Sequence, residues 1–205
     1  PYITYDNNYI ESIWWSLKRI ADKGLLYKGH KIVPYCPRCG TALSSHEVSQ
    51  GYKEVTERSA VVRFKVVGEE NTYIYAWTTT PWTLPSNVAL CVNANETYAR
   101  FNCEGRTVIM GDALIEKILG DKEITDKTTF PGSELVGMRY EPLFDFQRDA
   151  LKGKPDAENA FQVIADDYVT MTDGTGVVHQ APAFGEDDYR VGRAHHIPVL
   201  QLVNP

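Results

Sequence analysis

The sequence predicts a mixed α/β protein with a β-barrel-like core and a few peripheral helices. Short apolar segments of β type, bounded by turn residues, fill most of the chain after Gly51. Helical periodicity is confined to the first residues and to two short later segments. The strands do not alternate regularly with helices, which argues against βαβ units and favours a curled, barrel-like sheet.

The first expected element is a helix over residues 6–23. Asp6 is a suitable N-cap, and Gly24 suits the left-handed turn that ends many helices. Between them the apolar side chains recur at spacings of three and four, which places them on one face. That stripe consists of Ile10, Ile13, Trp14, Leu17, Ile20 and Ala21.

We expect a boundary near Gly51. Residues 1–50 are predicted to form a connective segment with the helix and a Cys-x-x-Cys pair, and residues 51–205 the main domain. Strands are expected at 60–67, 72–78, 87–92, 98–102, 107–110, 161–164 and 175–180. Helices are expected at 112–119 and 186–196, short strands with turns over 130–146, and a surface loop over 152–159.

Composition limits the class of protein. The chain has 205 residues, 43% hydrophobic and 23% charged, as expected for one soluble domain with a short appendage. It contains no apolar run near the roughly 20 residues that span a membrane, and no signal peptide. The start at Pro1 suggests a piece of a longer, cytoplasmic protein. A net charge of −6 argues against broad nucleic-acid binding, but not against contact with one RNA end.

The most informative stretch is Trp77-Thr-Thr-Thr-Pro-Trp-Thr-Leu-Pro-Ser-Asn87. Three threonines run off the end of a predicted strand, and Pro81 prevents that strand from continuing. Hydroxyl groups can orient a water or a ribose, and the indoles of Trp77 and Trp82 can stack on a base. This pattern predicts half of a small polar pocket, walled by two indoles.

A second stretch supplies the other half. Asp-Gly-Thr-Gly over 173–176 is a tight turn, and the strand after it carries His179. A helix then begins after Gly185 with acidic residues in its first turn, where the helix dipole favours their ionised form. Asp188 in that turn offers an anion for the α-ammonium group of an aminoacyl ester. Taken separately, each of these features is also common in ordinary strands and helix starts.

The two stretches together resemble the signature peptides of the editing domain of isoleucyl-tRNA synthetases, a domain inserted into the class I catalytic fold. Thr80-Pro81-Trp82 and His179 favour the isoleucyl branch over the valyl and leucyl branches. The segment from Tyr35 to Ser44 resembles the connective region before the insertion. Ala183-Phe184 favours the eukaryotic cytosolic type.

The resemblance implies an aminoacyl-tRNA deacylase that hydrolyses valyl-tRNA(Ile) after valine has been transferred to the tRNA. Whether the same site also cleaves valyl-adenylate is left open by the resemblance. Asp188 would hold the α-ammonium group, while Thr79 and Thr80 would position the ester and the attacking water. His179 would set the size limit against isoleucine. The remaining substrate contacts implied are Thr78 in the pocket, Trp82 near the terminal adenosine, and Asn87, which would fix the loop or touch the substrate.

Partners and cofactors follow from the same resemblance. The partner is the acceptor end of tRNA(Ile) carrying misattached valine, together with the rest of the parent synthetase; no membrane is involved, and the isolated fragment is expected to be monomeric. Editing needs no cofactor, whereas ATP and Mg²⁺ serve a synthetic site whose His-x-Gly-His and Lys-Met-Ser-Lys-Ser elements are absent here.

Cys36 and Cys39 have the spacing of half a zinc site, and the family's second pair lies beyond this chain, so no complete metal site is expected. The other two cysteines, Cys91 and Cys103, fall in predicted strands, and a reducing compartment explains all four. Two alternatives remain: a non-catalytic module that binds the tRNA acceptor end, and an editing domain of the valyl or leucyl branch.

Overall fold

The computed structural model describes residues 3–203, in two compact units, Pro1–Lys31 and Ile32–Pro205. The first unit contains helix α1 (Asn7–Asp22), as predicted. Asp6 caps it by accepting a hydrogen bond from the Asn8 amide at 2.9 Å, and Gly24 adopts a φ of 69° just after it. No residue of α1 is buried, and Trp14 on the predicted apolar stripe is 67% exposed.

The second unit begins with a small hairpin, β1 (Tyr35–Cys36) and β2 (Thr41–Ala42), followed by helix α2 (Ser45–Gln50). The sequence analysis did not predict α2. A capping box of Ser44 and Glu47 begins this helix: each side chain accepts a hydrogen bond from the other residue's backbone amide. The division between the units falls at Lys31, within the predicted connective segment, and the predicted boundary near Gly51 stays a prediction.

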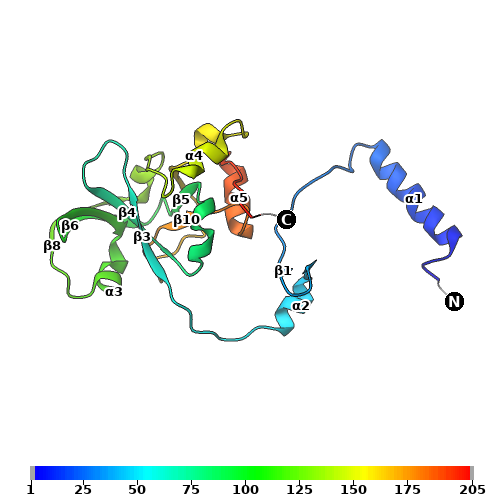
Figure 1. The fold of residues 1–205 in the computed structure, drawn as a ribbon, viewed down its shortest axis with the longest axis horizontal. Coiled ribbons are helices and arrows are strands. Elements are labelled where there is room, and N and C mark those ends of the chain that lie inside the picture. The colour runs from blue at the N-terminus through cyan, green and yellow to red at the C-terminus, as the bar shows by residue number, and fades with distance from the viewer. Residues whose placement is uncertain (1–2, 204–205) are drawn as a thin grey trace. The chain divides into compact units, whose positions relative to one another are not determined.

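The core of the second unit is one curled eight-stranded sheet of mixed direction, which confirms the predicted fold class (Figure 1). The strand order is β8-β6-β7-β4-β10-β5-β9, with β3 paired to β4. Parallel pairs are β4 with β7, β4 with β10, and β5 with β9. The strands are β3 (Ala60–Lys65), β4 (Thr72–Thr78), β5 (Ala89–Val92), β6 (Thr97–Cys103), β7 (Arg106–Gly111), β8 (Ile124–Pro131), β9 (Gln162–Ala165) and β10 (Val178–Gln180).

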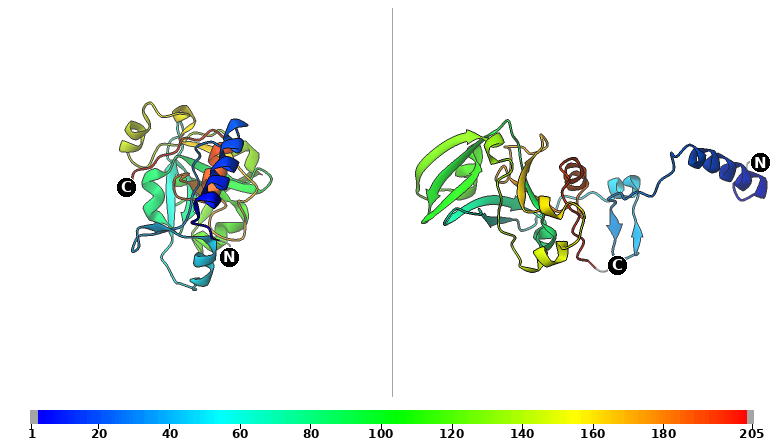
Figure 2. Two further views of the ribbon diagram at one scale, coloured as in Figure 1. Left: turned by 90° about the vertical axis from the view of Figure 1, so that its right-hand side faces the viewer. Right: turned by 90° about the horizontal axis from the view of Figure 1, so that it is seen from above.

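Three helices lie around this sheet: α3 (Ile115–Leu119), α4 (Phe146–Leu151) and α5 (Glu186–Ala194). Figures 1 and 2 show α4 and α5 at one end of the sheet and the strands β6 and β8 at the other. A 3-10 helix, η1 (Pro81–Ser86), follows β4 after Thr79 and Thr80. None of the helices among the described residues is long and apolar enough to cross a membrane.

Three further elements differ from what the sequence predicted. Strand β8 was missed because its residues are mostly polar and exposed; it lies at the sheet edge and pairs only with β6 among the described strands. The strand expected at 175–180 is shorter, since Gly176 has a φ of 72° and extended backbone resumes only at Val178. Helix α4 occupies Phe146–Leu151, and the sequence analysis assigned no element to residues 147–151.

The strands bury the main core. Apolar side chains of β3, β4, β5 and β9 are almost fully inaccessible, including Phe64, Ile74, Leu90 and Val163. A second cluster of buried apolar side chains is formed by α3 packing on β6 and β7. This packing fixes the relative position of β4, β10 and α5, the three elements that carry the two motifs.

Candidate active site

Strands β4 and β10 bring the two motifs together. They are parallel neighbours, with Trp77 directly opposite Val178. Parallel strands end at the same edge of a sheet, so the threonines after Trp77 and the residues after Val178 emerge side by side. The pairing therefore places Thr78 next to His179, although the two motifs are far apart in the chain.

A cavity of about 250 Å³ lies at this edge of the sheet. Five of the seven predicted site residues line it: Thr78, Thr79, Thr80, His179 and Asp188. The rest of the lining consists of Trp77, Thr83, Val178, Phe184 and Gly185.

Hydroxyl groups run along one side of the cavity as a connected series. The Thr80 amide donates to Thr78 Oγ1 at 3.0 Å, and the Thr83 hydroxyl donates to the Thr80 carbonyl at 2.9 Å. Thr80 Oγ1 lies 3.4 Å from both Thr78 Oγ1 and Thr83 Oγ1. The turn of η1 makes this possible, because it brings Thr83 back beneath the end of β4. Thr79 is exposed.

His179 closes the other side and is held in one tautomer. Its Nε2 lies 3.0 Å from Thr83 Oγ1. The single proton of Thr83 already goes to the Thr80 carbonyl, so Thr83 accepts here and Nε2 carries the imidazole proton. Burial lowers the pKa of His179 to about 4, which keeps the ring neutral at physiological pH. Its Nδ1 is buried with no partner among the described residues, and is a free acceptor.

Asp188 faces the cavity from the first turn of α5. Its Oδ2 accepts a hydrogen bond from the Ala181 amide at 2.9 Å. A side chain at Gly185 would put its Cβ 2.9 Å from the Asp188 carboxyl carbon, so only glycine leaves room for this carboxylate. Burial raises the pKa of Asp188 above its usual 3.8, against the lowering effect of the Ala181 amide. Desolvation therefore opposes the ionised form that the helix dipole was expected to favour.

Trp77 forms a wall of the cavity and rests on the turn that precedes β10. Gly174 has a φ of 71°, and a Cβ there would approach the Trp77 ring to 2.9 Å. Lys117 of α3 holds the same turn through Asp173 at 2.6 Å and the Thr172 carbonyl at 3.1 Å. The turn that looked like an ordinary hairpin signal thus supports the indole.

Two predicted site residues do not line the cavity. Asn87 is fully buried; its Oδ1 accepts from the Tyr140 hydroxyl at 2.7 Å and its amide donates to the Ala89 carbonyl at 2.9 Å. These contacts suit the first of the two predicted roles, fixing the loop, and Asn87 does not line the cavity. Trp82 is 68% exposed and lies outside the cavity, so one indole wall was predicted wrongly. Its contact with an adenosine stays a prediction.

Sequence reasoning missed Thr83 and Phe184. Thr83 lies inside the first motif, but its position depends on the compact turn of η1. The prolines indicated that the strand ends here, but they did not indicate the path of the chain after it. Phe184 lines the cavity from the turn between β10 and α5. Neither residue carries a sequence signal that separates it from its neighbours.

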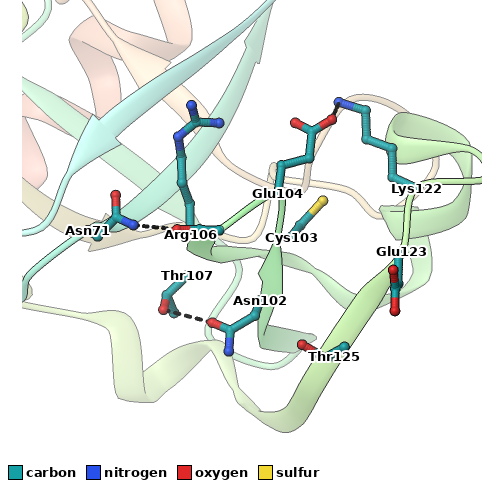
Figure 3. A pocket seen from close by; sticks show the side chains of 10 residues that line it. Asn71, Asn102, Cys103, Glu104, Arg106, Thr107, Lys122, Glu123 and Thr125 are labelled. Carbon is teal, nitrogen blue, oxygen red and sulfur yellow. Dashed lines mark hydrogen bonds and ion pairs between the residues drawn. The ribbon is translucent and has the colours of Figure 1, made fainter.

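A larger cavity, of about 600 Å³, lies at the other end of β4 (Figure 3). Two of its lining residues locate it: Asn71 directly precedes β4, and Thr107 pairs with Thr72, the first residue of β4. Polar groups there bond one another: Asn71 reaches the Gly105 carbonyl, Thr107 reaches Asn102, and Lys122 pairs with Glu104. No predicted site residue lines it, so it is separate from the candidate active site.

The Cys36–Cys39 segment forms a knuckle at the hairpin β1–β2. The Cys39 amide donates to Cys36 Sγ at 3.4 Å, and this hydrogen bond lowers the pKa of the Cys36 thiol. No group of three or more possible metal ligands occurs among the residues that the structure describes. Cys91 and Cys103 are buried in β5 and β6, in strands as predicted.

Comparisons with known proteins show the family to which the chain belongs. The family model described as tRNA synthetases class I (I, L, M and V) matches residues 1–196. Isoleucine–tRNA ligase from Clostridium acetobutylicum is 56% identical over 204 residues, which is 100% of this chain and 19% of that protein. The enzyme of the same name from Thermus thermophilus is 48% identical over 209 residues, covering 99% of this chain and 19% of its own length.

Among solved structures, GlLeuRS-CP1 aligns with a TM-score of 0.55 and 15% identity, over 66% of this chain and 59% of that one. This likeness concerns the fold. The chain spans about a fifth of the length of the curated relatives it matches. Those relatives come from Clostridium and Thermus, so the lean toward a eukaryotic cytosolic type is not supported. It rested on Ala183-Phe184, two residues in a single turn.

Proposed function

Because this chain belongs to the class I tRNA synthetases of the I, L, M and V group, we propose that its cavity hydrolyses a mischarged aminoacyl-tRNA, namely valyl-tRNA(Ile). The reaction is attack of a positioned water on the ester carbonyl, which releases valine and the tRNA. The observation that carries the proposal is the meeting of the threonine series with His179 and Asp188 around one small cavity.

The need for such a site follows from binding energies. A synthetic site built for isoleucine discriminates against valine by only about 1–3 kcal/mol for the missing methylene, a general limit for which isoleucyl-tRNA synthetases are themselves the standard example. A second, smaller site that hydrolyses the valyl ester corrects the errors. The cavity of about 250 Å³ is below the roughly 300–1,000 Å³ of pockets for drug-sized ligands, which suits an aminoacyl group but not a whole nucleotide.

Asp188 is the anchor for the α-ammonium group in this proposal. The carboxylate is half-buried and has one neutral partner, the Ala181 amide, so a bound cation would be its only charged contact inside the cavity. An ammonium within hydrogen-bond reach favours the ionised acid and reverses the effect of burial on its pKa. The amino acid and the charged form of Asp188 would then bind together.

Water and ester are oriented by neutral groups. Thr79 and Thr80 offer hydroxyls at the cavity, whereas Nδ1 of His179 is buried without a partner among the described residues. His179 is a poor general base because burial holds its pKa near 4. The acceleration would come from position and hydrogen bonding at the ester, with the 2′- or 3′-hydroxyl of the terminal ribose as a further participant.

In this proposal, the hydrogen-bonded pair of His179 and Thr83 limits the size of the amino-acid side chain that can enter the cavity. The imidazole is only 6% exposed and its orientation is set by the 3.0 Å contact with Thr83. A ring held in this way cannot move aside for an extra methylene, so the isoleucyl ester would be excluded. The relatives at 56% identity carry the name isoleucine–tRNA ligase, which favours this substrate over those of the valyl and leucyl branches.

A panel of tRNA(Ile) charged with valine, isoleucine, threonine or alanine tests the proposal. We expect this chain to hydrolyse valyl-tRNA(Ile) and to leave isoleucyl-tRNA(Ile) intact, whereas His179→Ala begins to hydrolyse the isoleucyl ester. Preference for another amino acid would assign a different editing substrate. Binding of tRNA without hydrolysis of any ester would support the non-catalytic module instead.

A further inference from the structure

A second groove, of about 430 Å³, lies along α5 beyond the candidate active site. One wall is the outer face of α5, with Tyr189 and Arg193 one turn apart. The opposite wall is the loop at Lys154, Pro155 and Asp156, and the chain leaving α5 closes the end with His196, Ile197, Pro198 and Val199.

The two strong cations of this groove are unpaired. Within the described chain, Arg193 and Lys154 form no ion pair, whereas their neighbours Arg190 and Lys152 bind Asp166 and Asp149 at 3.0 and 2.7 Å. The Arg193 guanidinium lies 6.0 Å from the Tyr189 ring centroid. Asp156 is the single carboxylate of the lining. In a chain of net charge −6, an aromatic ring beside two free cations is a feature that suits a polyanion with flat bases.

Backbone contacts hold the walls in place. Asn159 donates from Nδ2 to the His196 carbonyl at 2.9 Å, which ties the loop after Lys154 to the chain leaving α5. The Ile197 amide donates to the Gly192 carbonyl at 2.7 Å, which folds that chain back against the helix. A partner therefore meets a formed groove and loses little free energy in ordering it.

The groove begins next to the catalytic cavity. Asp188, which lines the cavity, is followed directly by Tyr189, which lines the groove. Arg193 is five residues after Asp188, about 7.5 Å along a helix axis. A strand whose last nucleotide enters the cavity thus has its preceding phosphates within reach of this face of α5.

We propose that this groove binds the single-stranded 3′ end of tRNA, with Arg193 and Lys154 on backbone phosphates and Tyr189 stacked on a base before the terminal adenosine. The assignment rests on the proposed function, because it takes the aminoacyl end to lie in the neighbouring cavity. An acidic peptide satisfies the charges equally well, but it has no use for the Tyr189 ring or for the adjoining cavity.

The test compares Arg193→Gln with Lys154→Gln in single and double variants. Lys122→Gln is the matched control: it also removes one positive charge, from the separate cavity at the other end of β4. Three quantities are measured: KM and kcat for valyl-tRNA(Ile), hydrolysis of valyl-adenosine, and direct binding of an uncharged oligonucleotide with the tRNA 3′ end, each from 50 to 300 mM salt.

We expect the double variant to raise KM for valyl-tRNA(Ile) and the oligonucleotide Kd roughly tenfold, and to reduce the salt slope by about 0.7 for each lost phosphate contact. The loss is specific to RNA, so the preference for valyl-tRNA over valyl-adenosine falls by the same factor. Lys122→Gln keeps wild-type values. Tyr189→Leu weakens the oligonucleotide about fivefold or more with no change in salt slope.

Three results would overturn the proposal: equal losses on valyl-tRNA and valyl-adenosine, which would assign the groove to support of Asp188; no loss on either; or binding of a glutamate-rich peptide in place of the oligonucleotide. The oligonucleotide measurement needs no hydrolysis. If the wild-type chain binds it through Arg193 and Lys154 but cleaves no ester, the groove stands and the proposed catalytic function fails.

Discussion

The hydroxyl of Thr83 lies 3.0 Å from Nε2 of His179 and joins two motifs that are 96 residues apart in sequence. Because Thr83 also donates to the Thr80 carbonyl, the contact fixes the protonated nitrogen of the imidazole as well as its position. The threonine series and the His179 side of the cavity are therefore one hydrogen-bonded unit.

Replacement of Thr83 by valine tests that unit. Thr83→Val keeps the side-chain shape but leaves the buried Nε2–H of His179 without an acceptor, which costs about 1–3 kcal/mol of unfolding free energy. We expect a lower midpoint in denaturant and a roughly tenfold loss in kcat/KM for valyl-tRNA(Ile). Thr83→Ser restores both. Thr79→Val, at an exposed threonine, is the stability control and keeps the wild-type midpoint; an unchanged midpoint in Thr83→Val would contradict the contact.

The protonation state of His179 gives a second prediction. Its pKa is lowered to about 4, so the folded chain binds fewer protons than the unfolded chain between about pH 4 and 6.5. Stability from this residue is present above pH 6.5 and is lost as the pH falls toward 4. His179→Gln should reduce that loss, as measured by urea unfolding at pH 4.5 and 7.5.

Nitrogen-15 NMR reads the same residue directly. The spectrum should show the Nε2–H tautomer of His179 without titration from pH 8 to 5, and Thr83→Val should allow both tautomers. A midpoint near 6.5 would show that the ring is not buried as described.

We expect Asp188 to lower the stability of the folded chain while it supports deacylation. Burial raises its pKa above 3.8, so the folded chain holds a proton more readily than the unfolded chain, and the contribution of this group to stability falls as pH rises through the folded pKa. Asp188→Asn removes that cost at pH 7 and should raise Tm, by about 2–4 °C for each kcal/mol. Deacylation should fall at least a hundredfold, because the α-ammonium loses its anion. A variant that is both less stable and active would remove Asp188 from the proposed role.

Gly174 provides a test of the cavity wall. Gly174→Ala introduces a Cβ within 2.9 Å of the Trp77 ring at a φ of 71°, so strain and a displaced indole are both expected. We expect a loss of about 2–3 kcal/mol in unfolding free energy and a higher KM for valyl-tRNA(Ile). Gly153→Ala is the matched control, since Gly153 has a φ of 75° with open space around it. Equal losses in the two variants would mean that Trp77 does not rest on Gly174.

The sequence alone determined several local elements and five of the residues that line the cavity. Residues with strong local signals behaved as predicted: Asp6 and Gly24 bound the first helix, and the alternation from Thr72 to Thr78 gave strand β4 with the predicted limits. The two motifs identified five residues that line the cavity, because hydroxyl, imidazole and carboxylate side chains at strand and helix ends can be recognised from residue type alone. These residues are Thr78, Thr79, Thr80, His179 and Asp188.

Tertiary structure alone decided what those groups touch. Asn87 looked like a site residue but is buried against Tyr140, and Trp82 is exposed and does not line the cavity that Trp77 lines. Thr83 became important only when the turn after β4 set it beside β10. The charge of Asp188 also depends on burial, which no pattern shows. Desolvation and side-chain contact are sums over neighbours distant in the chain, so they exist only once β4, β10 and α5 have packed together.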